Sequence, residues 1–164
     1  MKLIAIVILA AAAAVAAFPQ NALGAEAKSN TTLVGAWAVD TSRLPMAPSA
    51  RPKSVTITFS DAGAERIRTK VEVIDPAGGR LDADGVTPLD GSPTPVTPNF
   101  ESDMSSTLMP RPEVLIMQLA KNGSPASTRI YAVNADGKTM VETVAYFSAE
   151  GKPMLRKNYF SRVR

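Results

Sequence analysis

The sequence predicts an all-β protein, an antiparallel up-and-down meander of short strands that closes into a barrel. Apolar and polar residues alternate with a period of two through most of the chain after residue 27, and glycine-containing turns separate the alternating segments. Helical periodicity is hard to find in the same region. Eight or nine strands can be counted, and a meander of that length usually closes, because closure removes both unpaired edges.

Residues 1–27 have the composition of a cleavable secretion signal. Lys2 supplies a positive charge, and the alanine-rich apolar run at 3–18 is shorter than the roughly twenty residues that a membrane helix needs. Cleavage is expected after Ala27, with Ala25 as the alternative. We therefore expect residues 28–164 to form a single domain that is exported to the periplasm or secreted. Without cysteine, the chain offers no site for a bacterial lipid anchor.

Composition excludes several kinds of chemistry. The formal net charge is +3 with acids and bases interspersed, which gives no electrostatic footprint for nucleic acid. The chain has no His and no Cys, so Ser-His-Asp and Cys-His catalytic groups cannot form, and imidazole and thiolate metal ligands are absent. We expect no cofactor and no metal, and we assign no catalytic residue.

Two strands are expected at 53–60 and 66–73. Charged side chains at every second position of the second strand indicate that one face meets water, which is typical of an antiparallel sheet. The loop Asp61–Gly63 joins the two strands and places glycine where left-handed backbone is required. Pairing Ser60 with Ala64 brings the two apolar faces to the same side.

The stretch 76–112 is rich in proline and glycine and is expected to be irregular. Proline cannot donate to a central ladder, so strands there must be short or lie at an edge. We expect weak strands at 81–86 and 102–108, with a long loop at 88–99. That loop is either a rigid surface loop or a lid at the barrel mouth.

Glycine turns at 135–137 and 149–151 separate the last three strands. If both are three-residue turns, Asn134 pairs with Lys138, and Ser148 pairs with Lys152 in the last hairpin. The side chains of these strands then divide into two faces.

In this register one face carries Arg129 and Tyr131, and the other carries Glu142. Neither face is cleanly apolar. Because burial of an unpaired charge is costly, one face is expected to line a partly polar cavity or to lie under partial cover.

The face that carries Glu142 is our candidate ligand-binding surface. Glu142 lies opposite Asn158 and diagonal to Arg156, among Tyr146 and Phe160. A carboxylate, a guanidinium and a phenol in an apolar surround would orient a small amphipathic ligand. The same groups are the minimum for acid–base chemistry without histidine. A cross-strand ion pair on the solvent face is the alternative interpretation.

Four segments carry a resemblance to a known family. Gly35-Ala36-Trp37 is similar to the G-x-W motif that opens lipocalins, and GAWAVDTSRL, PKSVTITF, PLDGSPTPV and VNADGKTMVET resemble the small exported bacterial lipocalin-like (calycin-type) β-barrel proteins of unassigned function. The resemblance covers nearly the whole mature chain and implies a lipocalin-like barrel of eight to ten strands. Thr94 and Pro98 depart from the family pattern.

The resemblance also implies a structural pair at the closed end of the barrel. In lipocalins the tryptophan is covered by an arginine from the last strand. Trp37 and Arg162 match these positions, with Arg156 as the alternative arginine. A cation over an indole ring contributes about 0.5–2 kcal/mol.

We therefore expect a periplasmic binding or carrier protein that holds a small apolar or amphipathic molecule in the barrel. It should contain a cavity of at least about 300 Å³. The first alternative is a structural or interaction barrel with a filled core, acting through a surface such as an exposed apolar patch around 86–100. The second is an isomerase- or cyclase-type enzyme that uses carboxylate, tyrosine and arginine groups inside the barrel.

Overall fold

The computed structural model describes residues 32–163, so the expected signal at 1–27 lies outside the described residues. The described chain forms one antiparallel meander, which confirms the predicted fold class. Its strands are β1 (Gly35–Val39), β2 (Ser54–Asp61), β3 (Arg66–Ile74), β4 (Arg80–Pro88), β5 (Asp90–Pro95), β6 (Met104–Arg111), β7 (Val114–Lys121), β8 (Ser124–Val133), β9 (Thr139–Phe147) and β10 (Pro153–Arg162).

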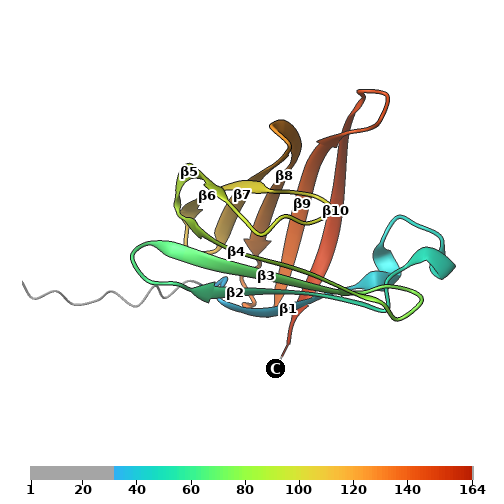
Figure 1. Ribbon diagram of the computed structural model, residues 1–164. Helices are drawn as coiled ribbons and strands as arrows, with labels where there is room; N and C mark the ends of the chain where they lie inside the picture. The colour runs from blue at the N-terminus through green and yellow to red at the C-terminus, as the bar shows by residue number, and fades with distance from the viewer. Residues whose placement is uncertain (1–31, 164) are drawn as a thin grey trace, which may run out of the picture.

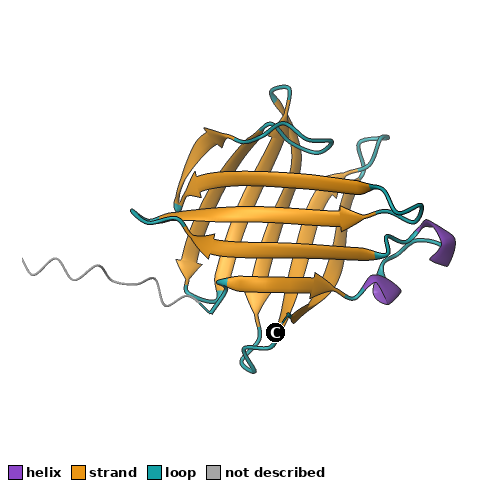
Figure 2. Cartoon of the chain, turned by 60° about the horizontal axis from the view of Figure 1, so that its bottom comes forward, coloured by secondary structure: helices purple, strands orange, loops and turns teal. Residues whose placement is uncertain are grey.

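The meander curls into a nearly closed barrel. The strand order is β4-β3-β2-β1-β10-β9-β8-β7-β6-β5, so the pairing of β1 with β10 joins the two halves of the chain. Among the described strands, β4 is hydrogen-bonded only to β3 and β5 only to β6, which leaves a seam between β4 and the β5–β6 hairpin. Strands β1–β4 run across the strands behind them (Figure 2).

The connection from β1 to β2 crosses one end of the barrel. It contains two short 3-10 turns, η1 (Thr41–Arg43) and η2 (Pro48–Ala50), and these lie beside the β9–β10 side of the barrel (Figure 1). No helix in residues 32–163 is long and apolar enough to cross a membrane.

Period-two alternation places the core inside the barrel. In β2, Ile57 and Phe59 are buried while Thr56 and Thr58 are less covered, and in β9 the same alternation buries Met140. The buried apolar cluster gathers side chains from both halves of the barrel: Leu33, Trp37, Ile57, Phe59, Ile67, Leu115, Met117, Leu119, Tyr131, Val133, Met140 and Phe160.

The β2–β3 register differs from the prediction. Ser60 pairs with Arg68 and not with Ala64, because the turn is wider than three residues. Gly63, Ala64 and Glu65 all adopt positive φ, and the Arg66 N–H donates to the Gly63 carbonyl at 2.9 Å. The register shift is even, so every side chain keeps its predicted face.

The β8–β9 register was predicted wrongly by one residue. Val133 pairs with Met140, so Asn134 does not pair with Lys138. The Asp136 carboxylate accepts hydrogen bonds from the N–H groups of Lys138 and Thr139, at 2.8 and 2.9 Å, and the turn gains a residue. An odd shift turns a strand over, so β8 presents the opposite face to the barrel interior. The last hairpin has the predicted register, with Ser148 N–H donating to Lys152 at 2.9 Å.

Three strands run through the proline-rich stretch, and β5 lies within 88–99, where we expected a loop. Pro93 and Pro95 belong to β5 itself. Since β5 borders the seam, these prolines occupy an edge strand, as their missing N–H groups require.

Candidate functional site

The barrel interior holds a cavity of about 490 Å³. Its walls come from β1–β3 and β8–β10, and the β1–β2 connection covers it with Leu44, Met46 and Pro52. Most of the lining is apolar and includes Val55, Val71, Val73 and Phe160. The charged and amide groups come from β8–β10, with Glu101 added from the connection between β5 and β6. The volume exceeds the threshold of about 300 Å³ that we set for a binding protein.

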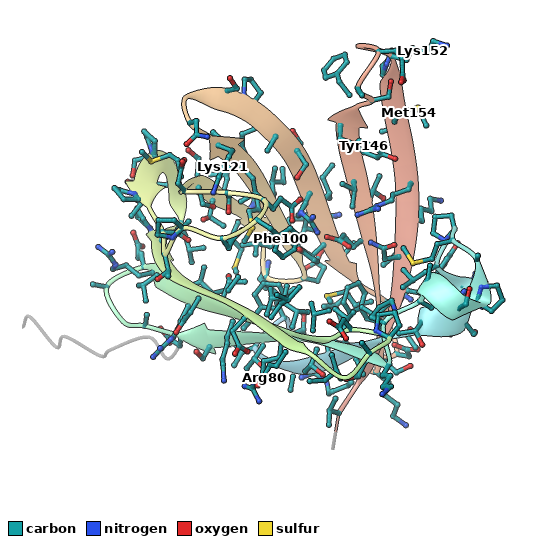
Figure 3. The ribbon with its side chains drawn as sticks, turned by 45° about the vertical axis from the view of Figure 1, so that its right-hand side comes forward. Arg80, Phe100, Lys121, Tyr146, Lys152 and Met154 are labelled. Carbon is teal, nitrogen blue, oxygen red and sulfur yellow. The ribbon has the colours of Figure 1, made fainter. Side chains whose placement is uncertain are left out.

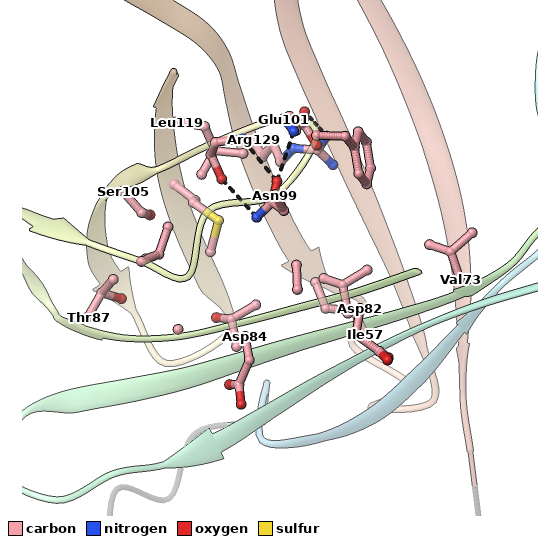
Figure 4. A pocket seen from close by; sticks show the side chains of 18 of the residues that line it. Ile57, Val73, Asp82, Asp84, Thr87, Asn99, Glu101, Ser105, Leu119 and Arg129 are labelled. Atoms are coloured by element: carbon pink, nitrogen blue, oxygen red, sulfur yellow. Dashed lines mark hydrogen bonds and ion pairs between the residues drawn. The ribbon is translucent and has the colours of Figure 1, made fainter. Parts of the chain in front are cut away.

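A second, smaller cavity of about 110 Å³ adjoins the first. It lies under β4 and the segment 96–103, the connection between β5 and β6, and is shown in Figure 4. The two cavities share seven lining residues: Ile57, Val71, Val73, Phe100, Glu101, Arg129 and Tyr131.

The polar end of the large cavity is built on a buried carboxylate. Glu142 is only 2% exposed, and Arg129 Nη1 donates to its Oε1 at 2.6 Å. The Asn158 amide donates to Glu142 Oε2 at 2.6 Å, so both carboxylate oxygens have partners. Register explains the contact, because Asn158 pairs with Glu142 across β9–β10 and Tyr131 pairs with Glu142 across β8–β9.

Arg129 links this carboxylate to a second one on the 96–103 segment. Its Nη2 donates to Glu101 Oε1, and Ser127 Oγ donates to the same oxygen at 3.2 Å. Lys121 Nζ donates to the Asn99 carbonyl. These contacts hold the segment inward over the barrel, and the Glu101–Arg129 contact is visible in Figure 4. Phe100, at the tip, is 73% exposed and still lines both cavities.

Burial and charge determine the protonation of the cluster. Burial raises the pKa of the Tyr131 phenol well above its usual value, and the negative charge of Glu142 raises it further. Burial lowers the pKa of Arg129, but the negative charges of Glu142 and Glu101 and the hydrogen bond to Glu101 outweigh that effect and raise it overall. Arg129 is therefore a permanent cation, and Tyr131 keeps its proton at neutral pH.

Several buried polar atoms have no hydrogen-bond partner within residues 32–163. Asn158 Oδ1, Arg156 Nε and Arg129 Nε belong to residues that line the large cavity. Thr69 Oγ1 and Ser105 Oγ belong to residues that line the small one. Buried donors and acceptors are normally satisfied, so these atoms mark places where a bound molecule or water can hydrogen-bond.

The structure brings together four of the five candidate residues. Glu142, Arg156, Asn158 and Phe160 all line the large cavity. Tyr146 lies further along the projecting β9–β10 hairpin (Figure 3), where its ring centroid is 5.6 Å from the Arg156 guanidinium. It lines a separate groove at the outer end of the barrel.

Trp37 and Arg162 meet at the opposite end of the molecule. The Arg162 guanidinium lies 4.1 Å from the Trp37 ring centroid and donates to the Val34 and Gly137 carbonyls at 2.8 and 2.9 Å. Trp37 Nε1 donates to the Leu33 carbonyl at 2.8 Å. Gly35 is required here, because its φ is +138° and a Cβ would lie 2.3 Å from Arg162 Nη1.

Sequence reasoning missed Arg129 and Tyr131 as partners of Glu142. The one-residue register error put them on the opposite face, whereas the structure buries Tyr131 and pairs Arg129 with Glu142. The available signal was Asp136, two residues before Lys138, since an aspartate in that position favours a side-chain-capped turn. Glu101 was missed because it lies between the loop expected at 88–99 and the weak strand expected at 102–108, and no sequence pattern indicated its contact with Arg129.

No group of three or more acidic residues in the described chain is arranged to hold a metal ion. The cavity is instead lined by apolar groups with one polar end, an arrangement suited to a small organic molecule.

The strands form a nearly closed antiparallel up-and-down barrel around a partly open cavity, and this fold resembles the calycin-like β-barrels. The solved structures that resemble it include the fluorescent protein UnaG. An asparagine-to-alanine mutant of UnaG superposes with a TM-score of 0.57 at 14% identity, covering 81% of this chain and 97% of that one. Wild-type UnaG gives 0.53 at 12% identity, covering 79% and 96%. No family model matches the chain, and no curated protein matches it in sequence.

Proposed function

We propose that this protein binds a small apolar or amphipathic molecule in the large cavity and acts as a carrier rather than as an enzyme. The observation that supports this most is the cavity of about 490 Å³, which falls in the range typical of ligand sites. The calycin-like fold, shared with UnaG, agrees with such a role.

The polar end of the cavity would orient the ligand. Arg156 Nε and Asn158 Oδ1 offer a donor and an acceptor, while the valine-rich wall receives the apolar part. Both oxygens of Glu142 are engaged by Arg129 and Asn158, which favours a role in holding the cavity wall over one in transferring protons.

A titration with the neutral fluorescent dye Nile red tests the binding function. We expect saturable binding with one site per chain and at least tenfold weaker binding by Val55→Trp, which would fill the cavity. Val55 lines the cavity, whereas Thr56 is its neighbour on the opposite face of β2. Thr56→Trp is therefore the matched control and should bind as the wild type does. Equal affinities of the two variants, or no dye binding by folded wild-type protein, would contradict the proposal.

We further propose that the chain belongs with the small exported bacterial lipocalin-like proteins and works in the periplasm. The composition of residues 1–27 supports export. Expression of the full chain in a Gram-negative host should place it in the periplasmic fraction. Its intact mass should correspond to a chain beginning at Glu26 or Lys28. An uncleaved chain in the cytoplasmic fraction would contradict this.

A further inference from the structure

The small cavity differs chemically from the large one. Four hydroxyl residues lie around it or beside it on β3, β4 and β6: Thr69, Thr87, Ser105 and Thr107. Thr69, Thr87 and Ser105 line the cavity directly. In Figure 4, Thr87 and Ser105 lie at the end of this space that is remote from Val73. Charged and amide groups line both cavities, and Glu101 and Arg129 are common to the two, whereas serine and threonine side chains line only the small one.

Only part of this hydroxyl cluster is satisfied by the protein. Thr107 Oγ1 donates to Thr87 Oγ1 across the seam. Ser105 is 3% exposed, yet neither its Oγ nor the buried Oγ1 of Thr69 has a hydrogen-bond partner within the described residues. A hydroxyl that is removed from water without a partner is destabilising, so two such atoms beside one cavity indicate a place prepared for a hydrogen-bonding group.

The backbone of β4 also shapes the small cavity. Gly85 pairs with Thr69, and a Cβ at Gly85 would lie 2.7 Å from Val96 Cγ1. Val96 therefore packs directly onto the β4 backbone and forms one wall of the small cavity. The residues that line both cavities connect the two polar ends: Ile57, Val71, Val73 and Phe100 supply an apolar wall, and Glu101 and Arg129 supply a charged one.

We propose that the small cavity is a second subsite, which takes a neutral hydrogen-bonding group, a hydroxyl or a carbonyl, at the far end of the same ligand. This inference rests on the proposed binding function and narrows the ligand to a class. The class comprises elongated apolar molecules with a polar group at each end. One end meets Arg156 and Asn158, and the other meets Ser105 and Thr69.

Decanol and decane-1,10-diol test this inference, because they differ only in the second hydroxyl. Each is titrated against protein carrying Nile red, and the ratio of the two affinities is measured for the wild type, Ser105→Ala and Thr69→Val. Comparing ratios between proteins cancels the difference in hydration of the two alcohols. We expect the affinity for the diol, divided by the affinity for decanol, to be about fivefold lower in each variant than in the wild type, because each variant loses one hydrogen bond to the second hydroxyl.

Thr143→Val is the matched control, since Thr143 lies on the outward face of β9 between buried residues, and it should keep the wild-type ratio. An unchanged ratio in both cavity variants would overturn the inference and leave the carrier function standing. So would Nile red binding that neither alcohol displaces. Absence of binding by all three probes would instead contradict the carrier function, and the inference with it.

Discussion

Arg129 is the cation that pairs with the carboxylates Glu142 and Glu101 at the polar end of the large cavity. It pairs with two carboxylates from distant segments of the chain, Glu142 on β9 and Glu101 on the 96–103 segment. Its side chain is 15% exposed and that of Glu142 only 2%. Buried ion pairs add little net stability, but removal of one partner leaves the other charge uncompensated.

Arg129→Leu should therefore destabilise the protein strongly. We expect a loss of about 3–5 kcal/mol in the free energy of unfolding, measured by urea denaturation, because Glu142 would remain buried without its cation. Glu142→Gln should cost less, since Arg129 would still be paired with Glu101. A smaller loss for Arg129→Leu than for Glu142→Gln would show that the carboxylate does not depend on this arginine.

Tyr131 should make stability depend on alkaline pH. Its pKa is raised in the folded protein by burial and by the charge of Glu142, whereas an unfolded tyrosine titrates near about 10. The folded state then holds more protons than the unfolded state above that pH, so stability should fall as pH rises. Urea midpoints between pH 9 and 11 should fall less steeply for Tyr131→Phe. Identical slopes for the wild type and Tyr131→Phe would refute the assignment.

The 96–103 segment is the element most clearly suited to move. Its own backbone ladder is short, with Val96 N–H donating to Asp103 at 3.1 Å and Asn99 N–H to Ser102 at 2.9 Å. Its attachment to the neighbouring strands includes the Asp103 N–H, which donates to the Ala120 carbonyl at 3.0 Å, and the side-chain contacts of Glu101 with Arg129 and of Lys121 with the Asn99 carbonyl. A segment held by a few contacts opens more readily than the strands beneath it.

Glu101→Gln should loosen this segment without unfolding the barrel. A hydrogen bond to a charged group contributes about 1.5–3 kcal/mol, so amide exchange in 97–103 should accelerate about tenfold or more. Hydrogen-exchange mass spectrometry resolves the segment. Glu113→Gln removes a comparable but exposed pair with Arg111 and should leave exchange in 97–103 unchanged. Equal protection in both variants would mean that Glu101 does not hold the segment.

Most strands of this protein could be predicted from sequence because one face is exposed to water and the other is apolar, whereas β5, which has no buried residue, was expected to be a loop. The strands expected at 53–60 and 66–73 are found at Ser54–Asp61 and Arg66–Ile74. The strand registers were harder to predict from sequence, because they depend on the length of each turn. The β8–β9 turn, capped by Asp136, is one residue longer than predicted, and this difference placed Arg129 on the wrong face of β8 in the prediction. The cavity volume depends on how far the two halves of the barrel stand apart, which alternation does not encode.

At the scale of the whole molecule, the seam between β4 and the β5–β6 hairpin is closed among the described residues by side-chain contacts, not by a backbone ladder. Between β4 and the β5–β6 hairpin the described contacts include the Thr107–Thr87 hydrogen bond and the packing of Val96 onto Gly85. Elsewhere neighbouring strands share continuous ladders, such as the nine residue pairs that run from Pro153 to Ser161 of β10 along β9.

The seam should be the least protected line of the barrel. Amides of β4 and β5 should exchange with solvent faster than those of β9 and β10, because their outer edges lack ladder partners within the described chain. Gly85→Ala should widen the difference by pushing Val96 away from β4. Uniform protection across the ten strands would show that the seam is as well closed as the rest.

An unpaired strand edge can also recruit a second molecule, and this barrel has two such edges. On one of them, Pro93 and Pro95 lack the N–H groups that a docking strand would need. On the other, Arg80, Asp82 and Asp84 present charge, engaged in ion pairs with one another and with β3. The seam beside the second subsite therefore lies between two strands that are poor templates for an intermolecular β-sheet. The barrel can lack a backbone ladder along this seam without a tendency to aggregate there.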